Sequence, residues 1–181
     1  SRRCEVYNSK LVTNNYNNLC VENDLNWHTS PWSKLFNKSL CGDLRFIEGM
    51  HIGEDLVFLY SYMLKCDKIY VSSDTDYCYY VDNQCSLTKR INNLDEELLA
   101  YNQVCDLVYK LIEAKKISDP AALSKLGWTI ACYVRRVLNA IYYGRERLSF
   151  ASRIKCIRGL EIEKYVNHIE MSSNKERIYV Y

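Results

Sequence analysis

The stretch SDPAALSKLGWTIACYVRRVLNAIYYG, residues 118–144, carries the clearest structural signal in the chain. Asp119 followed by Pro120 is a typical N-terminal cap and first helical position. Apolar residues then recur at helical spacing until Gly144, at Leu123, Leu126, Ile130, Tyr133, Val134, Val137, Leu138 and Ile141. The stretch therefore predicts one helix of about 24 residues, which would be about 36 Å long.

Helical patterns also lie on either side of this stretch. An apolar stripe begins at Leu94 and predicts a preceding helix, with Leu98, Tyr101, Cys105, Val108, Leu111 and Ile112. Ser149 is placed to cap a further helix that runs to about Arg158, and residues 161–171 predict another. We therefore expect residues 92–181 to form an all-α C-terminal subdomain, with a boundary near residue 91.

The first half has a more mixed character. Residues 54–65 place apolar side chains at helical spacing and predict a helix. The asparagine-rich residues 1–26 predict a short strand near 5–12. KIYVSSDTDYCYYV, residues 68–81, is β-branched and aromatic on both sides of a turn, which predicts two short strands. These patterns indicate an α/β first half in an α-rich chain.

Composition limits the class of protein. The 181 residues are 48% hydrophobic and 25% charged, and the net charge of +2 gives no case for nucleic-acid binding. Nine cysteines without a CxxC pair indicate a reducing compartment and not a disulfide scaffold. No apolar run reaches the roughly 18 residues of a membrane span. We expect a cytoplasmic protein with no nucleic-acid partner.

Three phrases occur in order along the first half: SPWSKLF (30–36), LRFIEGMHIGED (44–55) and YCYYVDNQCSLT (77–88). Together they resemble the acceptor-side half of bacterial family-2 glycosyltransferases with the GT-A fold. The resemblance covers about residues 27–90. It implies that this region is a partial GT-A sheet edge with a helix packed on it, so that residues 1–91 form the acceptor-side part of a catalytic domain.

The resemblance also implies roles for individual residues. Asp55 matches the family's general base for the acceptor hydroxyl, and Glu54 matches an orienting or acceptor-binding neighbour. Trp32 is a candidate for stacking on a sugar or for the core, while His51 and Ser86 are further substrate-binding candidates. A helix N-terminus favours an ionised carboxylate, which a base requires. The same fact leaves open that the acidic pair only begins a helix.

The donor side of such an enzyme has no counterpart in this sequence. The DTD at residues 74–76 follows the acidic pair and lies in a predicted turn, so we do not assign it to a metal. We expect the intact enzyme to use Mg²⁺ or Mn²⁺, with ligands that are not in this chain. The chain is then expected to be the C-terminal part of a longer transferase, inactive alone. The whole enzyme would move sugar from a nucleotide-sugar donor to a sugar or lipid-linked acceptor in polysaccharide synthesis.

Cations are concentrated late in the chain, with Glu146 as the only acid among them: Arg135, Arg136, Arg145, Arg147, Arg153, Lys155 and Arg158. This stretch is either a solvated helix face or a surface for anionic lipid or a phosphate-bearing acceptor. Peripheral contact with the inner membrane face is then expected. Exposed apolar surface on a partial domain also suggests a homo-dimer. The alternative function is a non-enzymatic helical interaction module that binds a partner through this basic stretch.

Overall fold

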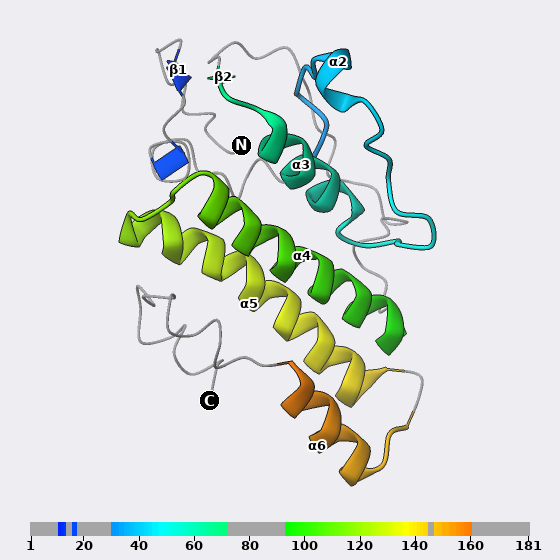
Figure 1. Ribbon diagram of the computed structural model, residues 1–181. Helices are drawn as coiled ribbons and strands as arrows, with labels where there is room; N and C mark the ends of the chain where they lie inside the picture. Colours follow the sequence, from blue (N-terminus) through cyan, green and yellow to red (C-terminus); the bar gives the residue numbers. More distant parts are fainter. Residues whose placement is uncertain (1–10, 14–15, 18–29, 72–92, 145–146, 161–181) are drawn as a thin grey trace, which may run out of the picture.

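The computed structural model describes residues 11–13, 16–17, 30–71, 93–144 and 147–160. Helices make up most of these residues (Figure 1). The elements follow one another as β1 (Leu11–Thr13), α2 (Lys38–Cys41), α3 (Glu54–Lys65), β2 (Ile69–Val71), α4 (Leu94–Ala114), α5 (Pro120–Tyr143) and α6 (Phe150–Gly159). None of the helices in these ranges combines the length and apolar character that crossing a bilayer requires.

The antiparallel helices α4 and α5 form the centre of the fold and lie side by side along their length (Figure 1). Their facing stripes are buried, with Val104 and Val108 of α4 and Val137 of α5 fully inaccessible to solvent. Burying such stripes supplies most of the stability of helices this long, because isolated helices are marginal in water.

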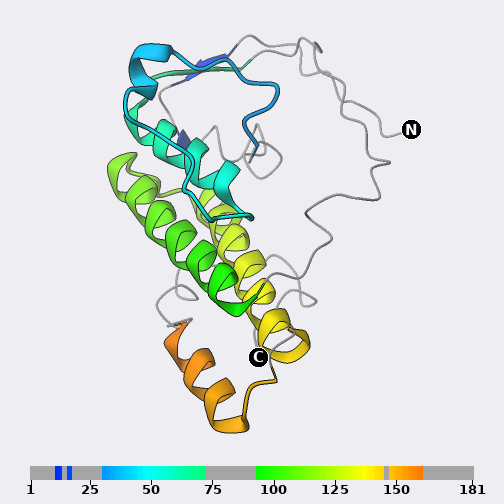
Figure 2. The same ribbon diagram turned by 90° about the vertical axis from the view of Figure 1, so that its right-hand side faces the viewer.

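The remaining helices add to this pair on different sides. Helix α3 packs on α4, and its inward residues, such as Leu56 and Tyr60, join the same core (Figure 2). Helix α6 turns back below α5, and the Tyr101 hydroxyl of α4 donates a hydrogen bond to the Leu160 carbonyl that follows α6. One hydrophobic core therefore spans α3, α4 and α5, with Leu160 at its edge.

The caps that the sequence predicts hold the helix ends. The Asp119 carboxylate accepts hydrogen bonds from the amides of Ala121 (2.8 Å) and Ala122 (3.2 Å), so α5 begins at Pro120 as predicted. Ser149 accepts from the amide of Ser152 at 3.2 Å and begins α6. The predicted helices at 54–65, from Leu94, at 120–143 and from 150 are confirmed. The helix predicted at 161–171 lies outside the described residues.

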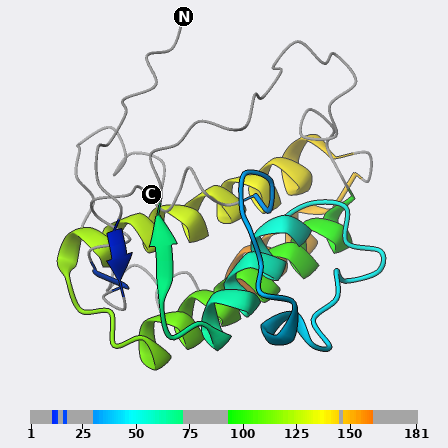
Figure 3. The ribbon, with the colours of Figure 1, turned by 90° about the horizontal axis from the view of Figure 1, so that it is seen from above.

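The predicted sheet edge is wrong. The described residues contain one antiparallel pair of three-residue strands, in which Leu11 pairs with Val71 and Thr13 with Ile69 (Figure 3). Residues 44–53 form an irregular segment and residues 54–65 a helix, so the described part of the chain is a small helical fold with a strand ribbon at one end. The prediction combined strands expected from the residues at 5–12 and 68–81 with the sheet edge that the family resemblance implies, whereas strand pairing in the described residues extends over three residues on each strand. The segment from 72 to 81 lies outside the described residues.

Candidate functional site at the start of helix α3

Helix α3 begins at a glycine that the structure requires. Gly53 is the N-cap residue and has left-handed angles, φ 76° and ψ 0°, which residues with a Cβ rarely adopt. A Cβ at this position would lie 2.5 Å from the Tyr133 hydroxyl oxygen, far inside contact distance. The close approach of Tyr133 from α5 therefore fixes the point at which α3 starts, and with it the positions of Glu54 and Asp55 in the first turn.

The preceding loop is held against α3 by aromatic rings. The Phe36 ring packs edge-on against Phe58 and Tyr62 of α3, with ring centroids 5.6 Å and 4.9 Å apart. Phe46 stacks on Phe58 at 4.6 Å with an interplanar angle of 12°. The Asn37 amide also donates to the Tyr62 hydroxyl at 2.7 Å. Both motif phrases of the loop, residues 30–36 and 44–55, are thereby anchored on the helix that carries the acidic pair.

This anchoring brings a cation toward Asp55. Ser33 has a left-handed backbone, φ 60°, which is uncommon for a residue with a Cβ and makes a sharp turn just before Lys34. The Lys34 ammonium donates to the Ser30 carbonyl at 2.6 Å and lies 5.9 Å from the centroid of the Trp32 ring. Burial lowers the pKa of Lys34, and the Asp55 carboxylate partly offsets this. The sequence motif did not single out Lys34.

The pKa of the Asp55 carboxyl is shifted by these surroundings. Burial raises the pKa of its carboxyl, the Glu54 carboxylate raises it further, and the Lys34 ammonium lowers it. A carboxylate with a raised pKa is a stronger base than an ordinary aspartate, which suits a group that accepts a proton from a hydroxyl. The first turn of α3 thus carries a half-buried carboxylate with a cation across from it.

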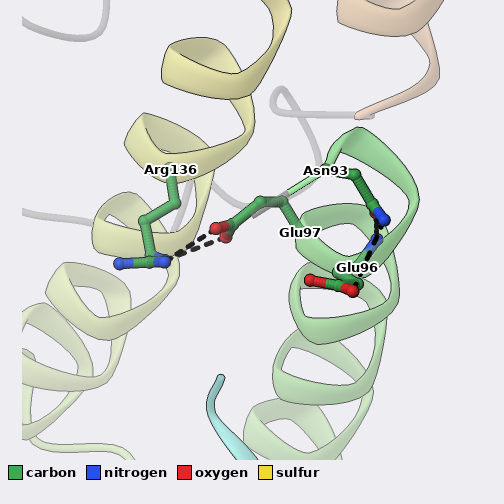
Figure 4. A network of polar contacts seen from close by, with 4 residues as sticks. All are labelled: Asn93, Glu96, Glu97 and Arg136. Atoms are coloured by element: carbon green, nitrogen blue, oxygen red, sulfur yellow. Dashed lines mark hydrogen bonds and ion pairs between the residues drawn. The ribbon is translucent and has the colours of Figure 1, made fainter. Parts of the chain in front are cut away.

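A largely buried ion pair joins α4 and α5 (Figure 4). Arg136 of α5 forms a two-pronged contact with Glu97 of α4, with Nε–Oε2 at 2.9 Å and Nη2–Oε1 at 2.7 Å. Glu97 is only 2% exposed. Burial raises the pKa of Tyr133, Arg136 lowers it, and Glu54 and Glu97 raise it, so these groups share one electrostatic environment.

Sequence reasoning missed this ion pair. The sequence predicts that Arg136 belongs to a basic stretch that faces solvent or an anionic partner, and for this residue that prediction is wrong. Glu97 could have indicated this pair from the sequence. It lies one turn before Tyr101 on the apolar stripe of α4, and an acid on a buried stripe needs a cation as partner.

Of the other predicted site residues, two lie at the surface and one lies outside the described residues. Trp32 is 38% exposed, so it lies at the surface near Lys34 and not in the core. His51 is exposed in the loop before α3, and within the described residues no hydrogen bond or ion pair joins it to Asp55. Ser86 lies outside the described residues, as does the DTD at 74–76.

The described residues offer no metal site. No group of three or more His, Cys, Asp or Glu side chains in these ranges could hold a metal ion. The described residues therefore do not fit the divalent cation that the family resemblance implies, and no step is assigned to a metal at this site.

Comparison with known proteins adds no relative. No family model matches the chain, and no curated protein or solved structure is significantly similar to it. The resemblance to glycosyltransferases therefore rests on the three phrases between residues 27 and 90.

Proposed function

We propose that this chain provides the acceptor side of a nucleotide-sugar-dependent glycosyltransferase, with Asp55 as general base. The observation that carries the proposal is the half-buried Asp55 carboxylate in the first turn of α3, whose pKa is raised by burial and by Glu54. Trp32 and His51 both expose their rings in the segment before α3, and an acceptor sugar could stack on such rings or donate hydrogen bonds to them. Donor-binding residues, and any metal that holds the donor diphosphate, then lie outside the described residues.

Asp55 accepts the proton of an acceptor hydroxyl while that oxygen forms a bond to the anomeric carbon of the donor sugar. The bond from this carbon to the diphosphate breaks, and the nucleotide diphosphate leaves with the electron pair. Lys34 acts through Asp55, because its positive charge opposes the rise in the pKa of this carboxyl and so favours its ionised form. Such a base typically contributes about 10²–10⁴-fold to the rate.

Asp55 needs no sheet beneath it for this role. The Gly53 backbone, the Tyr133 contact and the aromatic anchors of the loop hold the first turn of α3 in place. A reaction on polysaccharide or lipid-linked acceptors in the cytoplasm, at the inner face of the membrane, is the setting that we propose.

The test is turnover by the full-length protein with nucleotide-sugar donors and saccharide acceptors. Asp55→Asn is nearly isosteric and should lower kcat by about 10²–10⁴-fold while donor binding is kept. Glu54→Gln is the matched control, since it removes the adjacent charge and should cost much less. Full turnover by Asp55→Asn, or equal losses in both variants, would contradict the assignment of the base.

A further inference from the structure

Helices α5 and α6 carry no acidic residue. Their charged residues are all cations: Lys125, Arg135 and Arg136 in α5, and Arg153, Lys155 and Arg158 in α6. Helix α4 has the opposite character, with five acids spread from its first turn to its last: Asp95, Glu96, Glu97, Asp106 and Glu113. Among the cations of α5 and α6, Arg136 is neutralised by Glu97.

The end of α5 and the start of α6 also expose large aromatic rings. Tyr142 is 52% exposed, Tyr143 76% and Phe150 78%. The Arg153 guanidinium lies 5.3 Å from the centroid of the Tyr142 ring, so the two helices meet there. We call these rings, together with Arg153, Lys155 and Arg158, the α5–α6 tip. The tip lies at the opposite end of the molecule from α2 (Figures 1 and 2).

Helix α6 contacts the core near its C-terminal end and exposes other side chains along its length. Ile157 packs against the core, and Leu160 after the helix is buried in it. Phe150, Lys155 and Arg158 are exposed and fall within an arc of about 140° at 3.6 residues per turn. Within the described residues, neither of these two cations forms an ion pair.

We propose that the α5–α6 tip binds the surface of an anionic lipid membrane. Rings of this kind are favoured at the boundary between headgroups and acyl chains, and each lysine or arginine near an anionic leaflet strengthens attachment. Charge complementarity selects this partner, because the tip combines unpaired cations with exposed rings and its helices contain no acid that would repel phosphate. This binding mode is peripheral and does not depend on the role of Asp55.

The test is co-sedimentation of the full chain with vesicles of phosphatidylcholine, alone or mixed with phosphatidylglycerol. The chain should bind the mixed vesicles, and salt should weaken binding. Lys155→Gln with Arg158→Gln should weaken binding by about thirtyfold, since each cation contributes roughly a fivefold factor. The matched control is Lys38→Gln with Lys65→Gln, which removes the same charge from exposed positions on α2 and α3 and should have little effect.

A second double variant separates the contribution of ring insertion into the membrane from that of the cations. Tyr143→Ser with Phe150→Ser changes only exposed side chains and should weaken binding to mixed vesicles by roughly tenfold, also at high salt. Three results would overturn the proposal: no binding to mixed vesicles, equal losses in the double variant of the tip cations and in the control Lys38–Lys65 double variant, or complete competition by soluble glycerol phosphate at matched ionic strength. The last result would identify a site for phosphate groups and not for a membrane.

Discussion

The start of α3 and the α5–α6 tip both combine aromatic rings with charge, but they hold that charge differently. At the start of α3, Asp55 is half-buried and lies near Lys34, and the Arg136–Glu97 pair joins α5 to α4 with its carboxylate buried. At the tip, Lys155 and Arg158 point into solvent. Enclosed, paired charges alter pKa values and fix geometry, as a reactive site requires, whereas exposed cations act on a partner over a distance.

Two adjacent residues of α5 differ in whether their charge is paired inside the protein or exposed to solvent. Arg135 and Arg136 are neighbours in α5, yet Arg135 is exposed while Arg136 reaches the buried Glu97. Successive residues of a helix are about 100° apart around its axis, so one of them faces α4 and the other faces solvent. A run of basic residues in a sequence therefore does not mark a continuous basic surface.

The largest expected effect comes from removing the enclosed cation. Arg136→Ala leaves the Glu97 carboxylate buried without its partner and should lower the free energy of unfolding by about 3–5 kcal/mol. Arg135→Ala is the control on the same helix and should change it by less than about 0.5 kcal/mol. Urea unfolding followed by circular dichroism measures both. Equal losses would mean that the two arginines are equivalent and that the comparison fails.

An intermediate effect is expected at the glycine that begins α3. Gly53→Ala and Gly49→Ala both place a Cβ on a backbone with φ 76°, so they share the same backbone strain. Only at Gly53 does the new Cβ meet Tyr133, whereas nothing lies within 4 Å at Gly49. Gly53→Ala should therefore lower the unfolding free energy by about 1–3 kcal/mol more than Gly49→Ala. Similar losses would show that the Tyr133 contact does not fix the start of the helix.

The smallest expected effect concerns Asp55 and pH. Because the pKa of Asp55 is raised above its ordinary 3.8, the folded chain binds its proton more tightly than the unfolded chain does. The contribution of Asp55 to stability is therefore fully present below pH 3.8 and declines as pH rises through the higher folded pKa. Asp55→Asn lacks this titration, so relative to the parent chain it should gain stability between acidic and neutral pH.

Urea unfolding of Asp55→Asn and of the parent chain, each at an acidic and at a neutral pH, measures this difference in the free energy of unfolding. A helix start without catalytic function predicts the reverse at neutral pH, a loss of about 0.3–1 kcal/mol from the missing dipole interaction. A gain in the free energy of unfolding on Asp55→Asn at neutral pH thus indicates a base that is held at some cost to stability. A loss indicates a carboxylate that only begins a helix.

The sequence alone determined the helices α3 to α6 and their first residues. Asp119 and Ser149 cap helices within the next turn, and the apolar stripes repeat every three or four residues, so both signals are local. The acidic pair Glu54–Asp55 was found for the same reason, since it directly follows Gly53. The predicted sheet failed because strand pairing joins distant segments, and here it extends over only three residues on each strand.

Only the tertiary structure decided which residues share an environment. Lys34 approaches Asp55 because aromatic rings hold its loop on α3, and Tyr133 reaches Gly53 from α5. Glu97 and Arg136 are 39 residues apart and meet because α4 and α5 pack antiparallel. Such contacts depend on the packing of whole helices, and the free energy that selects the packing is spread over the entire buried core, so no short stretch of sequence specifies them.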